Sequence, residues 1–414
     1  MNYADAPNSS STGPWTPRVT IALAVLSAAA FVYVTAEIVP VGALPAIARD
    51  LRVSEAVVGT LLASYALAAA VATVPLVRWT ASWPRRRTLI FTLMSLTVSQ
   101  LISAMAPTFA VLALGRVLCA LTHGLMWSVI APIGTRLVPA SHAARATMAV
   151  YVGTALALVV GSPLTAALSQ LWGWRMAVVA IAFAAAAVTV AARLALPPMP
   201  MSEDSTRTGL PRPWHHRNRR LLTMSALTLV GVTGHFISYT FIVVIIRDVV
   251  GVRGSDLAWL LAAYGVAGLV AMAVLARPGD RRPKGAILLC LTGSSLAFAT
   301  LAALGFFDHR HTTPLVLLGV AAIVLWGAMA TAMPPILQSA AMRHSPEDPD
   351  GASGLYVAAF QVGIMAGSLL GGLLYQRAGI PATIAASAVL MIGALICVVA
   401  GRELFAVPRP TGAK

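Results

Sequence analysis

One carboxylate, Glu37, lies inside an apolar run where a charge is costly. The run is FVYVTAEIVPVGALPAI, from Phe31 to Ile47, and the other acidic residues of the chain fall in tails, loops or at the ends of apolar runs. Burying an unpaired carboxylate costs several kcal/mol, so we expect Glu37 to face a cavity or a partner, or to hold a proton. Burial disfavours its charged form and a nearby cation favours it, so a moving cation would make it load and release a proton. A static ion pair is the structural alternative.

A proline and a glycine that follow Glu37 are expected to weaken the same helix. Pro40 and Gly42 would loosen it and free backbone carbonyls towards a cavity. A passive kink is the alternative.

The cationic residues within apolar runs are few. Arg116 is the only Arg or Lys inside one, at a depth similar to that of Glu37, and because Arg keeps its proton its role would be electrostatic. His123 follows it by two helical turns and shares its face. His235 lies in TGHFISYTFI, with the hydroxyls of Ser238 and Tyr239 nearby. Imidazole changes charge near neutral pH, so both histidines are candidates for proton coupling, and hydrogen-bonded packing is the alternative for each.

Composition identifies the chain as an integral membrane protein. Of its 414 residues 58% are hydrophobic and only 10% are charged, far below the usual charged share of soluble proteins. The net charge of +15 is spread over short loops and forms no nucleic-acid-binding patch. The three cysteines lie in apolar segments without metal-ligand spacing. We find no Walker loop, metal cluster or nucleophile with a placed base, so we expect neither an enzyme nor a cofactor.

Apolar runs of membrane-spanning length predict twelve transmembrane helices. They lie near 20–47, 56–77, 88–106, 109–131, 145–168, 174–196, 221–247, 255–276, 285–304, 314–341, 353–375 and 380–400. About three times as many Arg and Lys residues fall on the side of the two termini as on the other side. The positive-inside rule therefore places both termini in the cytoplasm.

The longest polar interruption, from Leu196 to Arg220, separates six runs from six. We predict a cytoplasmic tail over 1–18, a six-helix bundle over 19–196, a flexible linker over 197–220, a second bundle over 221–401 and a tail over 402–414.

The two halves resemble each other, which indicates a duplicated unit. Arg49 and Asp50 match Arg247 and Asp248, Tyr65 matches Tyr264 one inserted residue later, and GSPLTAALSQLWG parallels GSLLGGLLYQRAG. Extending the 198-residue offset back from Asp50 brings Glu37 onto His235. The fold class is therefore an all-α membrane protein of two pseudo-symmetric six-helix bundles.

Over nearly its full length the chain resembles the major facilitator superfamily. The segments TAEIVPVGALPAIARDL, GRVLCALTHGLMWS and GTALALVVGSPLTAALSQLWGWR resemble its drug/proton antiporters, and most closely the bacterial sugar-efflux transporters. In that fold the spans carrying Glu37, Arg116 and His235 line the central cavity, which implies an ion pair between Glu37 and Arg116 and makes His235 the stronger titrating candidate. One departure is PLVRWTASWPRRR, which lacks the acid of the family's loop motif, whereas ARPGDRRPK keeps Asp280.

The fifth span resembles the pliable, cavity-sealing helix of exporters, although close helix packing explains its small residues equally well. These candidate conformational residues are Gly153, Gly161 and Pro163, with Gly363 and Gly367 in the repeat mate. Aromatic, hydroxyl and amide groups could bind a sugar or an amphipathic drug, although packing or interface anchoring is the commoner role of each: Trp127, Tyr151, Ser238, Tyr239, Trp326, Tyr356 and Gln361.

The sequence thus predicts a secondary transporter of the inner membrane that works by alternating access. It would export a small neutral or amphipathic solute, sugar or drug-like, in exchange for protons. We expect a monomer whose partners are the solute, protons and the lipid bilayer, with no nucleic acid. A proton-coupled symporter or facilitator for uptake is the alternative, and a membrane-embedded enzyme or a non-transporting receptor would share the composition.

Overall fold

The computed structural model describes residues 14–199, 218–307 and 312–401, and within them it contains helices and no strand. The linker and the two predicted tails lie largely outside these ranges. The main helices, with the π-helical segments that continue two of them, are α1 (Pro17–Gly42), α2 (Leu44–Leu51), α3 (Glu55–Trp79), α4 (Arg85–Ala104), α5 (Phe109–Arg136), α6 (Ala143–Leu156), a π-helical segment (Ala157–Gly161), α7 (Ser162–Trp172), α8 (Trp174–Ala195), α10 (Arg219–Tyr239), α11 (Ile242–Val244), a second π-helical segment (Ile245–Val250), α12 (Ser255–Arg281), α13 (Pro283–Phe307), α14 (Thr313–Arg343) and α15 (Pro349–Ala400).

Ten of the described helical stretches are long and apolar enough to cross a membrane. One of them, α15, is two helices that meet at Gly379, whose φ of 78° a residue with a side chain rarely adopts. A further apolar helix, α3, has 25 residues. The described residues therefore contain twelve helices of membrane-spanning length, as predicted. Helices are expected because a backbone in hydrocarbon must satisfy its hydrogen bonds internally.

The first predicted span, 20–47, is not one helix. The chain breaks at Ala43, where α1 ends and the short α2 begins with a proline at its first turn. The sequence places the weak point correctly beyond Glu37, but it does not show that a new helix starts there. Polar side chains cap several helix starts, including Thr108 before α5 and Asn218 before α10.

The helices form two groups, which we call the first bundle (α1 to α8) and the second bundle (α10 to α15). Within the first bundle α1 packs on α6 and α8, and α5 packs on α3 and α4. Within the second bundle α10 packs on α15, and α14 packs on α12 and α13. Between the bundles α15 contacts α3 and α5, while α6 contacts α12 and α14. These cross-contacts are equivalent pairs under the sequence repeat.

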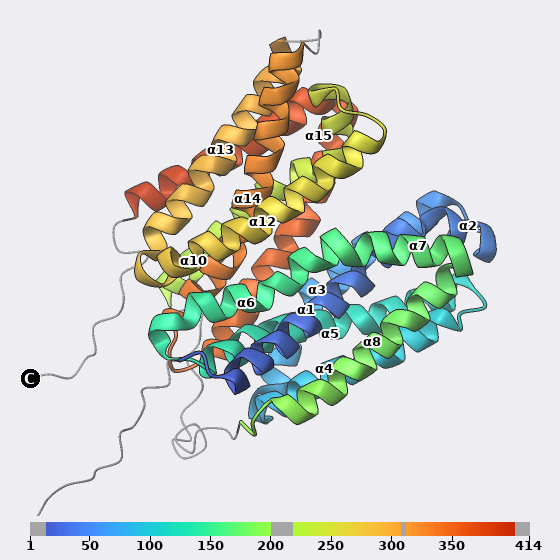
Figure 1. The fold of residues 1–414 in the computed structure, drawn as a ribbon, viewed down its shortest axis with the longest axis vertical. Helices are drawn as coiled ribbons and strands as arrows, with labels where there is room; N and C mark the ends of the chain where they lie inside the picture. Colours follow the sequence, from blue (N-terminus) through green and yellow to red (C-terminus); the bar gives the residue numbers. More distant parts are fainter. Residues whose placement is uncertain (1–13, 200–217, 308–311, 402–414) are drawn as a thin grey trace, which may run out of the picture.

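Figure 1 shows how the bundles lie relative to each other. They are closest near the end at which α1 begins and α15 finishes, and they separate towards α2 and α7. We call the first of these the tail end and the opposite one the far end.

Small residues set the close packing of α1 on α6. A Cβ atom at Gly153 would overlap the backbone carbonyl oxygen of Ser27, which cannot rotate away. Gly153→Ala should therefore destabilise the fold by about 1 to 3 kcal/mol, the usual cost of overpacking. Thermal unfolding in detergent would measure it. Gly372→Ala is the matched control, since its Cβ would meet nothing within 4 Å, and equal melting temperatures for the two variants would contradict the packing argument.

Candidate functional site

Arg116 donates hydrogen bonds to the backbone of α1 one turn before Pro40. Pro40 has no backbone N–H, so the carbonyl of Ala36, one turn earlier, loses its usual helical donor. The guanidinium of the buried Arg116 supplies the missing donor: Nη1 donates to the Ala36 oxygen at 2.5 Å and Nη2 to the Glu37 backbone oxygen at 2.8 Å. The same group lies 4.8 Å from the centre of the Tyr65 ring. Arg116 therefore clamps α5 to the α1 backbone beside Glu37.

The direct ion pair expected between Glu37 and Arg116 does not form in this structure. Arg116 donates to backbone oxygens instead of the carboxylate. The sequence shows that the two charges share a depth in the membrane, but it does not show that Pro40 leaves a carbonyl that competes for the guanidinium.

The side chain of Glu37 faces His123. Its Oε2 lies 3.9 Å from His123 Nε2. On the other side of the ring, His123 Nδ1 lies 2.8 Å from the hydroxyl of Tyr65, which also contacts Cys119 Sγ at 3.4 Å. Glu37, His123 and Tyr65 thus form a continuous polar line across α1, α5 and α3. Tyr65 is a site residue that stands out in the sequence only as a position of the repeat.

This polar line can hold a proton in more than one place. A tyrosine hydroxyl both donates and accepts, so its contact with Nδ1 persists whether the His123 ring is neutral or charged. Nε2 points at the carboxylate, and 3.9 Å is longer than a hydrogen bond, so a proton passes only when the two groups approach to about 3 Å. Glu37 and His123 are therefore the described pair best placed for proton exchange.

Arg116→Lys should reduce transport almost as much as Arg116→Ala. One ammonium cannot reproduce the planar fork that reaches two successive carbonyls, and losing a charge-assisted hydrogen bond corresponds to about ten-fold or more. Initial transport rates of reconstituted protein would measure the loss. Arg175→Lys at the far end is the control, because its side chain is 37% exposed, and full transport by Arg116→Lys would show that charge alone matters at this position.

The second bundle carries an aromatic cluster at the equivalent place. The 199-residue offset that relates Tyr65 to Tyr264 also relates Trp127 to Trp326. The Trp326 ring lies 5.6 Å from Tyr264 and 5.7 Å from His235, and its Nε1 donates to His235 Nδ1 at 3.0 Å. Tyr239 stacks on His235 with 5.0 Å between ring centres. These residues of α10, α12 and α14 form one wall of rings.

Ser238 was expected to contact the solute, but it lies in a helix interface. Its buried hydroxyl pairs with Ser387 Oγ at 2.7 Å, between α10 and α15. Ser238 and Tyr239 are adjacent on the helix and therefore point in different directions.

The other expected solute residues lie on helices of both bundles. The rings of Trp127 and Tyr151 are 5.0 Å apart on α5 and α6. Tyr356 donates to the Pro334 oxygen at 3.0 Å, and the Oε1 of Gln361 is buried without a partner among the described residues. A residue that the sequence did not single out, Gln338 of α14, donates to the Trp127 oxygen at 3.2 Å and so joins the two bundles.

The expected conformational residues lie where helices touch. Gly161 ends the π-helical segment between α6 and α7, and a Cβ there would overlap Thr35 Oγ1 of α1. Pro163 is in the first turn of α7. Gly363 and Gly367 bring α15 against α10, with Cβ positions 2.8 Å from Val232 Cβ and 2.6 Å from the Thr233 oxygen. Both small-residue segments therefore pack closely, and the widened π turn interrupts regular helix within the fifth span.

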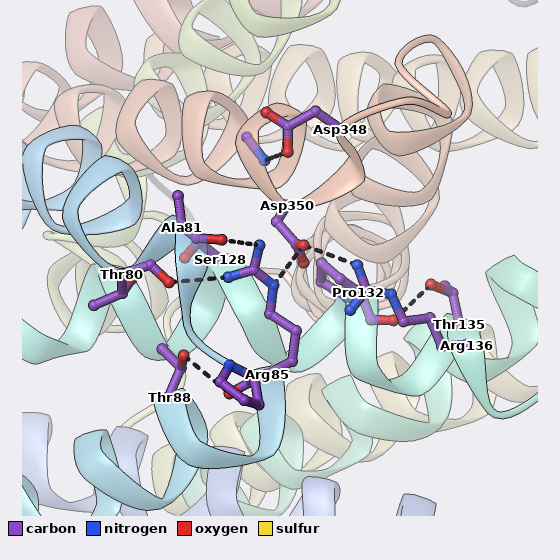
Figure 2. Close-up of polar contacts among 12 residues, drawn as sticks. Thr80, Ala81, Arg85, Thr88, Ser128, Pro132, Thr135, Arg136, Asp348 and Asp350 are labelled. Carbon is purple, nitrogen blue, oxygen red and sulfur yellow. Dashed lines mark hydrogen bonds and ion pairs between the residues drawn. The ribbon is translucent and has the colours of Figure 1, made fainter. Parts of the chain in front are cut away.

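Charged residues join the bundles at the tail end. Figure 2 shows the carboxylate of Asp350, at the start of α15, facing Arg85 and Arg136 of the first bundle. Asp350 Oδ2 accepts from Arg85 Nε at 2.6 Å and from Arg136 Nη2 at 2.8 Å. Arg85 also donates to the oxygens of Thr80 and Ala81. The acid that the loop motif lacks is thus supplied across the interface by the second bundle.

A second cluster stands at the equivalent contact of α6 with the second bundle. Asp280 accepts from Arg145 Nε and from the Ala144 backbone N–H, both at 2.6 Å. Arg343 of α14 donates to the Gly279 oxygen at 3.3 Å. In both clusters the second bundle provides the acid and the first bundle the arginine, so we refer to them together as the tail-end latch.

Comparisons with known proteins agree with this architecture. The family model of the Major Facilitator Superfamily matches residues 26–349 and 224–414. A chloramphenicol efflux pump of Mycobacterium tuberculosis strain H37Rv is 64% identical over 408 residues, which cover 99% of this chain and 98% of the pump. The corresponding pump of strain CDC 1551 has the same identity and coverage.

Two solved structures share the fold at low identity. The human organic anion transporter TETRAN matches with a TM-score of 0.72 and 15% identity, covering 93% of this chain and 100% of that one. The proton:xylose symporter XylE matches with a TM-score of 0.71 and 12% identity, covering 94% and 96%. The predicted twelve-helix fold is confirmed, and the chain belongs to the Major Facilitator Superfamily of membrane transporters.

Proposed function

We propose that this transporter exports chloramphenicol or a similar small, neutral, amphipathic drug in exchange for protons. The observation that carries the proposal is 64% identity, over nearly the whole of both chains, to a chloramphenicol efflux pump. Chloramphenicol is a neutral molecule with an aromatic ring and hydroxyl groups, which suits the rings and polar groups around Trp127, Tyr151 and Trp326. The sugar that the sequence resemblance suggests stays a prediction.

Proton coupling is assigned to Glu37 and His123. α5 runs from the far end to the tail end, and His123 lies two turns closer to the tail end than Arg116. With both termini in the cytoplasm, as the distribution of Arg and Lys favours, a proton taken up by Glu37 from outside would leave inwards past His123. Release of the carboxylate's proton would follow the change of conformation that opens the tail end.

The tail-end latch would close the cytoplasmic side while solute leaves on the other. Its contacts run from α15 and α12 of the second bundle to α4, α5 and α6 of the first, so they must break when the bundles separate at that end. One proton moving down about 100 mV and one pH unit releases roughly 3.7 kcal/mol, enough for a several-hundred-fold solute gradient.

The test uses purified protein in sealed vesicles with radiolabelled chloramphenicol. An imposed inward proton gradient should drive the drug in the opposite direction, and a protonophore should stop it. Movement of drug and protons in the same direction would favour the symporter alternative. Counterflow of drug that does not respond to the proton gradient would favour a facilitator. Arabinose serves as the comparison solute, and its transport in place of the drug would overturn the proposed solute.

A further inference from the structure

His235 is held by a bond that determines its protonation state. Trp326 Nε1 donates to His235 Nδ1 at 3.0 Å. An indole N–H can only donate, so the ring nitrogen that faces it must carry a lone pair. The imidazole is therefore neutral, with its hydrogen on Nε2. A charged ring would carry hydrogen on both nitrogens and would turn one N–H against another.

His123 lacks this constraint although it is also a buried histidine. Its Nδ1 faces the Tyr65 hydroxyl, which donates to a neutral ring and accepts from a charged one. The two imidazoles thus differ in what their partners allow: His123 can titrate without losing its contact, whereas His235 can do so only by breaking the bond to Trp326.

The other neighbours of His235 offer no charge that would favour an imidazolium. On α10, Phe236 and Tyr239 lie 4.9 and 5.0 Å from the ring. From α12, Tyr264 lies against Tyr239 and Trp326, and α13 contributes Phe298 behind Trp326. From α15, Gly367 lies against Phe236. No Asp, Glu, Lys or Arg of the described ranges forms a hydrogen bond or ion pair with His235.

Nε2 of His235 lies on the opposite side of the ring from the nitrogen that Trp326 binds. Trp326 is fully buried, whereas His235, Phe236 and Tyr239 are only half-buried, so part of each of these three side chains stays accessible. Nε2 of His235 hydrogen-bonds to no group in the described part of the chain. A polar N–H among rings is well suited to orient a flat solute that carries an acceptor oxygen.

We propose that His235 is a solute-recognition residue whose Nε2–H, fixed by Trp326, donates to an acceptor oxygen of a neutral aromatic solute. A nitro, carbonyl or hydroxyl oxygen would accept this bond while the solute ring packs on Phe236 or Tyr239. The assignment rests on the proposed export function, and it replaces the proton-tuning role that the sequence repeat suggested for His235. It leaves proton coupling to Glu37 and His123.

The first test measures binding of chloramphenicol to the purified full-length protein between pH 5.5 and 8. His235→Phe keeps a ring but has no donor, so its dissociation constant should rise about ten-fold, the usual effect of a lost hydrogen bond. His235→Gln places an amide N–H near the position of Nε2 and cannot become charged. Its dissociation constant should stay within about three-fold of that of the unmodified protein, with the same pH profile.

The second test observes the effect of the Trp326–His235 hydrogen bond directly, in the unmodified protein and without dependence on drug transport. Nitrogen-15 NMR of labelled histidine, with His235→Gln to assign the signal, should show a neutral ring protonated on Nε2 throughout this pH range. Trp326→Phe removes the indole donor, so Nδ1 no longer has to keep its lone pair, and the His235 signal should shift as hydrogen becomes shared between the two ring nitrogens. Trp127→Phe, the same change at the repeat-related position, should leave the signal of His235 unchanged.

Three results would overturn the inference: a His235 ring that becomes charged in the unmodified protein, unweakened drug binding by His235→Phe, or a flattened pH profile in His235→Gln. The failure of the proposed function looks different. In that case the unmodified protein neither binds nor moves chloramphenicol, while the NMR experiment still reports the protonation state that the Trp326–His235 hydrogen bond sets.

Discussion

Glu37→Gln should abolish the accumulation of drug that an imposed proton gradient drives, and should leave exchange of drug across the membrane in the absence of a gradient. The amide keeps the size and shape of the carboxylate but cannot take up or release a proton. A proton gradient is worth roughly a several-hundred-fold solute gradient when coupling is intact, so the expected loss is the whole of that factor. Counterflow should persist, because it needs alternating access and a solute site but no proton.

The structure explains why the loss should be specific to this acid. Glu37 lies beside His123 inside the first bundle. Arg116 donates to the Glu37 backbone oxygen, and the Tyr65 hydroxyl contacts the other side of the His123 ring. Asp256, in the first turn of α12, is an exposed carboxylate and provides the control. Asp256→Asn should accumulate drug normally. Normal gradient-driven accumulation by Glu37→Gln would remove this carboxylate from the coupling mechanism and leave His123 to carry the proton alone.

Much of the architecture was predictable because the membrane restricts what the backbone can do. A run of about twenty apolar residues has to be helical, so twelve runs predict twelve spans. A lone carboxylate in such a run is expensive, which singles out Glu37 without any knowledge of the fold. The repeat had further information, since Trp127 and Trp326 are related by the same offset as Tyr65 and Tyr264.

The contacts between helices were not predictable in the same way. Arg116 was assigned to the carboxylate of Glu37, but it binds two backbone oxygens, of which the Ala36 oxygen is the one that Pro40 leaves without a donor. Whether a guanidinium meets a carboxylate or a carbonyl depends on helix rotation by a fraction of a turn, and hydropathy has no information on it. The same limit explains Ser238, which faces α15 although its neighbour Tyr239 faces the rings.

The histidines show a related limit. The nearby hydroxyls of Ser238 and Tyr239 and a span expected to line the cavity make His235 the stronger titrating candidate in the sequence. Its indole partner comes from α14, far along the chain, and that partner changes which chemistry the imidazole can perform. A side chain's neighbours decide between a proton carrier and a fixed donor.

Asp350→Asn should open the tail end. Asp350 is 3% exposed, and its carboxylate is shared by Arg85 and Arg136 across the contact between the bundles. Removing one member of a buried pair leaves the other charge uncompensated, at a cost of about 3 to 5 kcal/mol. That cost applies when the bundles are closed at the tail end, because separation lets water reach Arg85. A shift of about 3 kcal/mol changes the ratio of closed to open protein by roughly a hundred-fold.

A cross-link can report this ratio, because α3 and α15 touch beside the latch. A Cβ at Gly354 would lie 3.5 Å from Val77 Cβ, which suits a disulfide. With Val77→Cys and Gly354→Cys introduced together, and exposed Cys397 replaced by Ser, mild oxidant should link the otherwise unmodified transporter readily. Adding Asp350→Asn should slow the cross-link at least about ten-fold and reduce net export, because the transporter then closes rarely on the cytoplasmic side.

The two arginines provide a graded control within the same cluster. The side chain of Arg85 is 7% exposed and that of Arg136 is 39% exposed. A pair that water screens contributes little, so Arg136→Gln should slow the cross-link by a small factor. Arg85→Gln should slow it nearly as much as Asp350→Asn, since it leaves the buried carboxylate with its more exposed partner only. If Asp350→Asn cross-links as fast as the parent double-cysteine protein, the latch does not hold the tail end closed, and closure must depend on the apolar contacts of α3 and α5 with α15.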